Sequence, residues 1–111
     1  MITKPVSRAF LKELALERFG DMVKVVVDCK RNIMAIGAQM HADEEQMLLE
    51  DGSAQEDLWG INIYPERFGD GFIEFDSMIN LRPRQNNRTR SVDDPAQQKV
   101  IRSTVSVLVP S

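Results

Sequence analysis

Apolar and polar side chains alternate between Gly71 and Pro83, and this stretch constrains the fold of the chain most strongly. The apolar set is Ile73, Phe75, Ile79 and Leu81, and the polar set is Glu74, Asp76, Asn80 and Arg82. A period of two is typical of a β-strand that packs one face on a core. The pattern predicts one long strand over residues 71–83, followed by a basic, asparagine-rich loop.

Length and composition place the chain among small globular domains. Its 111 residues, 42% hydrophobic and 28% charged, can bury one core, so we expect a single domain over residues 1–111. No apolar run approaches the roughly 20 residues that cross a bilayer, and the N-terminus lacks the apolar segment of a signal peptide. Cys29 is the only cysteine, so no intrachain disulfide can form. These features predict a cytoplasmic protein with no membrane partner.

Charge is distributed unevenly, although the net charge is only −3. Residues 41–76 hold eleven acidic side chains and one basic side chain, whereas both flanking segments are net basic. The simplest interpretation is a set of solvated faces that attract one another in the folded molecule. A molecule with an acidic and a basic side also suits head-to-tail association or an anionic partner.

Two helices are predicted, one near each end of the chain. Ser7 can cap a helix over residues 8–19, and Gly20 suits the left-handed conformation that ends a helix. Asp94 can cap a helix over residues 95–109, whose first residue is a proline. Apolar residues recur at helical spacing in both: Phe10, Leu11, Leu14 and Phe19, then Val100, Ile101, Val105 and Leu108.

Further strands are predicted between these helices, over residues 22–28, 33–40 and 58–64. Asn32 fits the tight turn between the first two of them. Pro65 ends the third, and the turn after it predicts a hairpin with the long strand.

The segment between the second and third of these strands is ambiguous. Residues 43–50 fit a short helix slightly better than a strand, and both remain open. The predicted fold class is α+β: an antiparallel, mostly meandering sheet of four to five strands, with the N-terminal and C-terminal helices packed on one face.

Several local strings extend over nearly the whole chain: VKVVVD (23–28), IMAIG (33–37), MHAD (40–43), LLEDGS (48–53), DLWGINIYP (57–65) and NLRP (80–83) with Asn87 and Arg88. Together they resemble a family of short prokaryotic proteins that is classed as a domain of unknown function. The resemblance implies a stand-alone cytoplasmic domain and brings no activity, substrate or catalytic residue.

The first candidate site is the loop after the predicted long strand. Its polar residues are Arg82, Arg84, Asn86, Asn87, Arg88 and Arg90. Guanidinium groups are planar donors that suit phosphate or carboxylate. The simpler interpretation is a solvated basic loop that pairs with the acidic segment.

The second candidate is His41 with Asp43, Glu44 and Glu45. Histidine titrates near neutrality and is the usual acid–base residue, and with carboxylates it can hold a divalent metal. A lone histidine is more often structural. We therefore expect neither a metal nor a cofactor.

A third candidate combines residues from different strands. Asn62, Asn80 and Arg82 are predicted to project from one outward face of the sheet, near the small residues Ala35 and Gly37. His41 or Asp57 could reach the same edge and complete a polar pocket. The simpler interpretation is an exposed sheet face or one that a second subunit buries.

We expect a non-enzymatic binding or interaction module that associates with itself. The reason is a half-apolar outward face, which consists of Val26, Ile33, Ala35, Gly37, Tyr64, Phe72 and Met78. The alternative is a small enzyme or a receptor for an anionic ligand that uses His41, Asp57, Asn62, Arg82 and Arg88. An acidic protein is a further expected partner. Nucleic acid is disfavoured by the acidic isoelectric point and the lack of interleaved aromatic residues.

Overall fold

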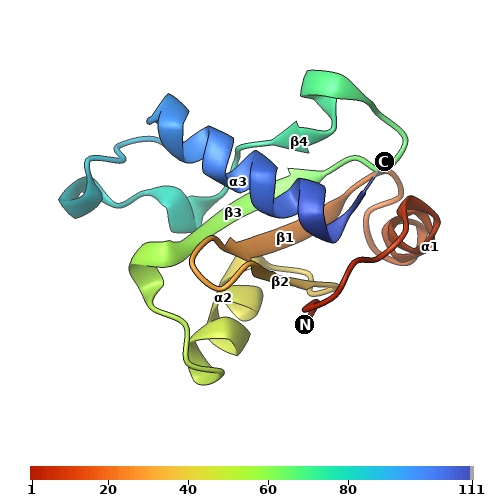
Figure 1. The fold of residues 1–111 in the computed structure, drawn as a ribbon, viewed down its shortest axis with the longest axis horizontal. Coiled ribbons are helices and arrows are strands. Elements are labelled where there is room, and N and C mark those ends of the chain that lie inside the picture. The colour runs from red at the N-terminus through yellow and green to blue at the C-terminus, as the bar shows by residue number, and fades with distance from the viewer. Residues whose placement is uncertain (111) are drawn as a thin grey trace.

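The structure, a computed structural model, describes residues 1–110, and an antiparallel sheet lies at its centre (Figure 1). The four strands, in the order β2-β1-β3-β4, are β1 Val23–Asp28, β2 Ile33–Ile36, β3 Leu58–Ile63 and β4 Ile73–Glu74. The register sets Val26 of β1 opposite Ala35 of β2 on one side and opposite Gly60 of β3 on the other. The predicted α+β class and the antiparallel sheet are confirmed.

Three α-helices surround the sheet: α1 Arg8–Arg18, α2 His41–Glu50 and α3 Pro95–Leu108. Ser7 Oγ accepts from the Phe10 N–H at 3.1 Å, and Asp94 Oδ1 accepts from the Ala96 N–H at 2.9 Å, so both predicted caps are correct. Short 3₁₀ helices occupy connections at Gln55–Asp57, Gly69–Gly71, Met78–Asn80 and Pro83–Gln85. None of the helices in the described part of the chain has the length and apolar character needed to cross a membrane.

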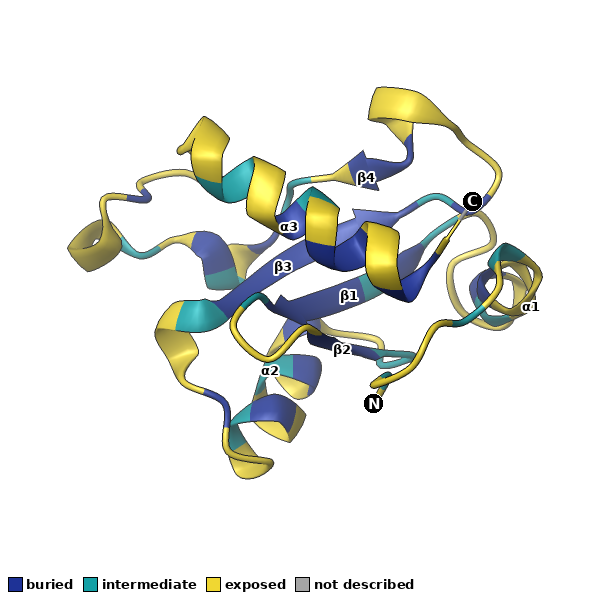
Figure 2. Cartoon of the chain, viewed as in Figure 1, coloured by how far each residue is buried: buried dark blue, intermediate teal, exposed yellow. Residues whose placement is uncertain are grey.

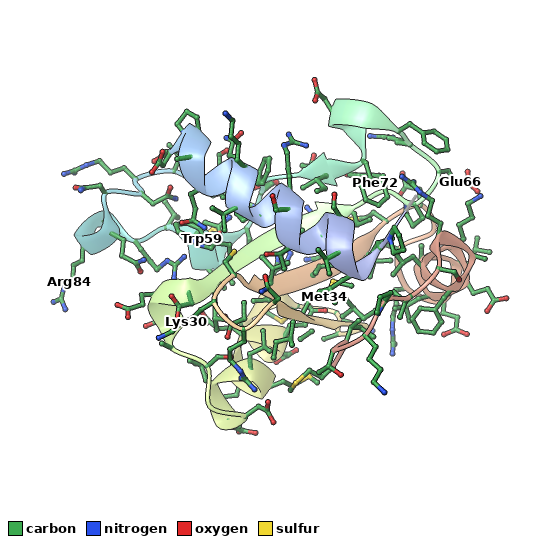
Figure 3. All side chains as sticks on the ribbon, viewed as in Figure 1. Lys30, Met34, Trp59, Glu66, Phe72 and Arg84 are labelled. Atoms are coloured by element: carbon green, nitrogen blue, oxygen red, sulfur yellow. The ribbon has the colours of Figure 1, made fainter. Side chains whose placement is uncertain are left out.

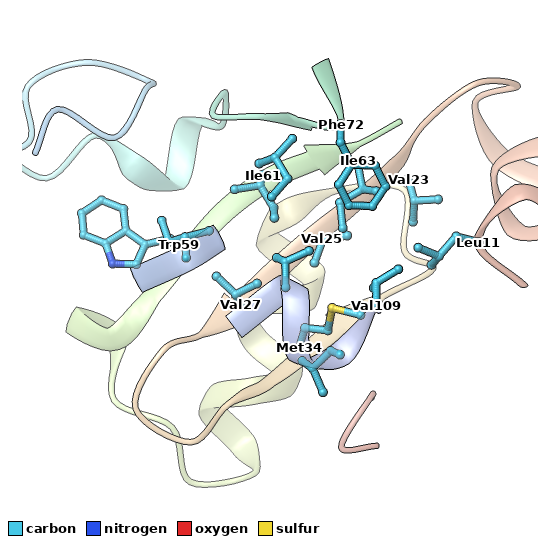
Figure 4. Close-up of a cluster of buried hydrophobic side chains, with 14 of the residues drawn as sticks. Leu11, Val23, Val25, Val27, Met34, Trp59, Ile61, Ile63, Phe72 and Val109 are labelled. Carbon is cyan, nitrogen blue, oxygen red and sulfur yellow. The ribbon is translucent and has the colours of Figure 1, made fainter. Parts of the chain in front are cut away.

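The terminal helices share one hydrophobic core with one face of the sheet (Figure 4). α3 lies across the strands in Figure 1, and its buried residues include Ile101, Val105 and Leu108. α1 adds Leu11 and Ala15 to the same core. The apolar residues predicted to face the core from these helices are only partly correct, because Phe10, Phe19 and Val100 are 44%, 38% and 44% exposed.

A second core fills the opposite face of the sheet, under α2. It joins Leu48 of α2 to the strand residues Val26, Ile33, Ala35 and Leu58. The helix favoured for residues 43–50 is therefore confirmed, and Figure 2 shows β1, β3 and the inner side of α2 as buried.

This second core corrects the predicted outward face. Val26, Ile33 and Ala35 are 0%, 7% and 0% exposed, because α2 of the same chain covers them. These residues do not supply the apolar surface from which self-association was predicted.

The predicted long strand over residues 71–83 is wrong. Only Ile73 and Glu74 pair with β3, and two 3₁₀ turns follow. Ser77 begins the first turn by accepting from the Ile79 N–H, and Pro83, which has no N–H, begins the second. Burial is therefore the opposite of the prediction at two positions: Asn80 is 0% exposed and Leu81 is 39% exposed.

Two predicted strands also end earlier than expected. β2 stops at Ile36 rather than at residue 40, because Gly37 takes a left-handed conformation with φ of 93°. β3 stops at Ile63, one residue before the predicted end.

Candidate functional site

A pocket of about 360 Å³ lies on the α2 side of the sheet, just beyond the first residue of that helix. Its floor contains Lys24 of β1, Asn62 of β3 and Glu74 of β4, which form one row across three paired strands. Its other residues are Met22, Met40, His41, Ala42, Asp76, Ser77, Met78, Ile79 and Arg90. We call this cavity the His41–Asn62 pocket.

Asn62 is 5% exposed and its amide orientation is fixed by its partners. Its Nδ2 donates to Glu74 Oε1 at 2.8 Å and to the Asp76 carbonyl at 3.4 Å. Because both partners can only accept, the nitrogen is the atom that faces them. Among residues 1–110, Asn62 Oδ1 has no hydrogen-bond partner, although it is buried. A buried acceptor without a partner requires an explanation, and a ligand is one.

His41 is the first residue of α2 and is 8% exposed. Its Nε2 lies 2.7 Å from the carbonyl oxygen of Ile61. A carbonyl can only accept, so Nε2 carries the proton and Nδ1 is the acceptor nitrogen of the neutral ring. Burial lowers the pKa of His41 below its ordinary value, which keeps the imidazole neutral at neutral pH.

Two cations, Lys24 and Arg90, line the pocket, and each makes one contact within the protein. Arg90 Nε donates to Asp76 Oδ1 at 2.8 Å, in an ion pair. The Lys24 ammonium lies 5.3 Å from the centre of the Phe19 ring, a cation–π contact with a residue outside the pocket lining. Arg90 uses only Nε in that pair and Lys24 makes a cation–π contact rather than a hydrogen bond, so the pocket offers donors as well as acceptors, and the expected anionic ligand stays a prediction.

Asn80, a predicted site residue, joins the loop to the edge of β3. Its Oδ1 accepts from the Gly60 N–H and its Nδ2 donates to the Gly60 carbonyl, both at 2.9 Å. These are the bonds that a neighbouring strand would make, so the side-chain amide replaces the missing continuation of β4. Asn80 is therefore structural.

Arg82 also contacts the edge of β3. Its guanidinium donates to the carbonyls of Gln55 and Leu58 and lies 4.1 Å from the centre of the Trp59 ring. Burial lowers the pKa of Arg82. This side chain packs against the protein and is not directed into the His41–Asn62 pocket.

Asn87 connects the rest of the loop by hydrogen bonds. Its Nδ2 donates to the carbonyls of Asn80, Thr89 and Ser91, and its Oδ1 accepts from the Asp93 N–H. Asn86 beside it is exposed and takes the left-handed conformation with φ of 59°. The loop is thus ordered by its own asparagines.

Arg84, Arg88, Asp43 and Asp57 lie outside the pocket lining. Arg84 points away from the body of the molecule in Figure 3. Arg88 and Asp43 are exposed, and Asp57 lies in the 3₁₀ turn before β3. The predicted convergence of His41, Asp57, Asn62, Arg82 and Arg88 is wrong, because only His41 and Asn62 meet in one cavity.

Several lining residues were not predicted as site residues: Met22, Lys24, Met40, Glu74, Asp76, Ser77 and Met78. One of them, Glu74, could have been found from the register of the predicted hairpin. In that register Asn62 lies opposite Glu74, so the two side chains are neighbours on one face of the sheet.

Glu44 follows His41 by one turn on the buried side of α2 and is 0% exposed. Its Oε2 accepts from the Ala38 N–H at 3.2 Å, and burial raises its pKa to about 9. The carboxyl group is therefore protonated at neutral pH. Within residues 1–110, no group of three His, Cys, Asp or Glu side chains is placed to hold a metal ion.

A second cavity, of about 510 Å³, lies between α3 and the segment around β4. Arg8 on its wall donates to the carbonyls of Pro65 and Arg67 and lies against the rings of Phe68 and Phe72. These contacts connect α1 to the turn before β4, so the role of Arg8 is structural.

The fold and the pocket define a small α+β domain with one polar cavity beside its second core. A family model described as "Protein of unknown function (DUF5674)" matches residues 1–108, and the chain belongs to this family. The predicted resemblance to an uncharacterised family is thereby confirmed, while its prokaryotic origin stays a prediction. No curated protein and no solved structure was found to match the chain.

Proposed function

We propose that this protein binds a small molecule in the His41–Asn62 pocket. The observation that carries the proposal is Asn62, which lines a cavity of about 360 Å³ and whose buried Oδ1 has no partner among residues 1–110. An unpaired buried polar group costs about 1–3 kcal/mol, and a ligand that donates a hydrogen bond would remove that cost. The cavity volume lies within the range of small-molecule sites.

Binding is favoured over catalysis by the surroundings of the reactive groups. His41 Nε2 bonds a backbone carbonyl rather than a serine or cysteine. Burial raises the pKa of the Cys29 thiol to about 11, so this cysteine is not an activated nucleophile. His41 Nδ1 remains an acceptor, and that suffices to hold a ligand.

Other expectations stay predictions. They are self-association, an acidic protein partner and a cytoplasmic location. The basic loop is a weaker candidate for an anion, because Arg82 and Arg90 are engaged within the protein.

The test is a screen of small polar molecules by two-dimensional ¹H–¹⁵N NMR on the full chain. We expect a binding molecule to shift the amide signals of residues 40–42, 62 and 74–79 together. Perturbations confined to the cavity beside Arg8, or no perturbation with any molecule, would contradict the proposal.

Two leucine variants provide the matched comparison. Asn62→Leu removes the unpaired acceptor and is expected to abolish binding. Gln46→Leu makes a similar amide-to-leucine change on the exposed side of α2 and should leave binding unchanged. Equal binding by both variants would show that Asn62 does not hold the ligand.

A further inference from the structure

We infer that the His41–Asn62 pocket takes a neutral ring compound with neighbouring hydroxyl groups, of the size of a single sugar. This inference rests on the proposed function and specifies its ligand class. It follows from the charged side chains of the lining, which offer donors and acceptors side by side, and from the apolar residues that share the cavity with them.

Four charged side chains of the lining keep hydrogen-bonding capacity. Arg90 donates to Asp76 through Nε alone, so within residues 1–110 its two terminal nitrogens and Asp76 Oδ2 have no hydrogen-bond partner. These two side chains are 55% and 44% exposed, so a ligand can reach them. Lys24 makes only a cation–π contact in the described part of the chain. Glu74 Oε2 is likewise available, because the bonds from Asn62 and Tyr64 both go to Oε1.

Donors and acceptors lie next to each other in this lining. The guanidinium of Arg90 and the carboxylate of Asp76 are in contact, with Nε 2.8 Å from Oδ1. Lys24 and Glu74 stand on either side of Asn62, in one row across three paired strands. A hydroxyl group both donates and accepts, so two neighbouring hydroxyls bond to a cation and to a carboxylate at once. Hydrogen bonds with a charged partner are the stronger class.

A charged ligand fits this lining less well. The two cations and the two carboxylates cancel, and the lowered pKa of His41 keeps its ring neutral. A ligand carboxylate bonded to Arg90 would lie close to Asp76, and a ligand ammonium group bonded to Asp76 would lie close to Arg90. Like charges placed together cost free energy, and a ligand charge would also lose its water shell. Because the two signs are in contact in the lining, a zwitterion meets the same conflict.

The apolar part of the lining suits the faces of a sugar ring. It consists of Met22, Met40, Met78 and Ile79. A sugar ring carries hydroxyl groups at its edge and C–H groups on its two faces, and methionine side chains adjust their shape to such apolar faces. The cavity of about 360 Å³ is near the lower end of the range of small-molecule sites, roughly 300–1,000 Å³, which suits one ring.

The experiment compares neutral hexoses with their charged counterparts on the unmodified full chain, at constant ionic strength and at a pH where the counterparts are ionised. Glucose, galactose and mannose are each paired with the uronate, which carries a carboxylate, and with the 2-amino sugar, which carries an ammonium group. Free alanine is the zwitterionic comparison. Binding is measured by titration of the ¹H–¹⁵N spectrum at residues 40–42, 62 and 74–79. We expect at least one hexose to bind about tenfold more tightly than both of its counterparts and than alanine, because only the hexose avoids a like charge.

Each result has a definite meaning. A uronate, an amino sugar or alanine that binds at these residues as tightly as the hexoses would overturn the inference and leave the proposed function in place. No shift at these residues with any of the three hexoses would also overturn the inference, and the wider screen then decides the proposed function separately.

Two variants of the ion pair add a second readout. Asp76→Asn removes the carboxylate and should improve uronate binding relative to the hexose, by about tenfold, whereas Arg90→Gln should do the same for the amino sugar. Asp70→Asn changes an exposed carboxylate outside this lining and should alter neither ratio. Unchanged ratios in both pocket variants would contradict the roles given to Asp76 and Arg90. If a variant does not fold, as judged by circular dichroism, the comparison on the unmodified protein still decides the question.

Discussion

Asn80 is fully buried and forms both hydrogen bonds that a neighbouring strand would give Gly60. Its Nδ2 also donates to the Arg90 carbonyl at 3.0 Å. Asn80→Leu keeps the branched shape of the side chain but leaves these backbone groups unpaired, so we expect it to lower the free energy of unfolding by about 2–4 kcal/mol. Urea denaturation measures this change.

The control for this variant is an asparagine of the same loop. Asn86 is exposed and left-handed, so Asn86→Gly should change the free energy of unfolding by less than about 0.5 kcal/mol. Similar values for the two variants would show that the Asn80 amide does not complete the edge of β3.

Gly60 requires the absence of a side chain for a packing reason. A Cβ atom at this position would lie 2.5 Å from Cβ of Ser77. We expect Gly60→Ala to lower the free energy of unfolding by about 1–3 kcal/mol through overpacking, measured by thermal and urea unfolding. Gly71→Ala is the matched control, because a Cβ there would meet Arg67 side-chain atoms at 3.5 Å or more. If Gly60→Ala does not lower the free energy of unfolding, the segment around Ser77 must lie farther from β3 than described.

Glu44 makes the stability of the protein depend on pH. Burial raises its pKa from the ordinary value of 4.5 to about 9, so the folded state favours the protonated form. Its stabilising contribution is complete below about pH 4.5 and is lost as the pH rises towards 9. Glu44→Gln cannot ionise, so its stability relative to the unmodified protein should increase steadily across that range.

The measurement for Glu44 is urea denaturation at several pH values between 4 and 9. Glu50→Gln, at the exposed end of the same helix, should show no such trend. A Glu44→Gln variant whose relative stability stays constant with pH would disprove the protonated state of the buried carboxyl group.

At the scale of elements, α2 covers the second face of the sheet, so both faces are buried. Leu48 is 0% exposed against the second core, whereas the adjacent Met47 is 40% exposed. We expect Leu48→Ala to lower the free energy of unfolding by about 2–5 kcal/mol and Met47→Ala to change it by less than about 0.5 kcal/mol. Equal effects, measured by urea unfolding, would mean that α2 does not pack on the sheet as described.

The sequence predicts the elements well where local signals decide them. Caps at Ser7 and Asp94 and the turn at Asn32 follow from backbone chemistry that acts within a few residues. The segment after β4 was mispredicted because alternation suggested a strand. Ser77 and Pro83 instead turn the chain, and the side chains of Asn80 and Arg82 reach the sheet edge in place of the backbone.

At the scale of the whole molecule, the sequence indicated three members of the pocket, His41, Asn62 and Arg90, but not their setting. Their meeting depends on the angle at which α2 crosses the sheet and on the path of residues 74–79, which are tertiary features without a local signal. The second core was missed for the same reason. A face of Val26, Ile33 and Ala35 indicates that something covers it, but not that α2 does.

The uneven charge distribution is also explained at this scale. Arg31 pairs with Asp51 at 2.7 Å and Arg90 pairs with Asp76 at 2.8 Å, so each ion pair joins a basic flank to the acidic segment 41–76. This arrangement matches the simplest interpretation of the sequence, in which oppositely charged segments attract one another within the chain. Exposed pairs of this kind contribute at most about 1 kcal/mol each.

The most direct test of the account is the side-chain carbonyl ¹³C resonance of Asn62 during titration with a small polar molecule that the screen finds to bind. Hydrogen bonding to Oδ1 changes the shielding of that carbon, so the signal should move until the pocket is saturated. The corresponding signals of Asn80 and Asn87, whose oxygens are already bonded within the protein, should stay in place. An Asn62 signal that does not move while the molecule binds elsewhere, or a screen in which no molecule binds, would contradict the assignment of this pocket as a ligand site.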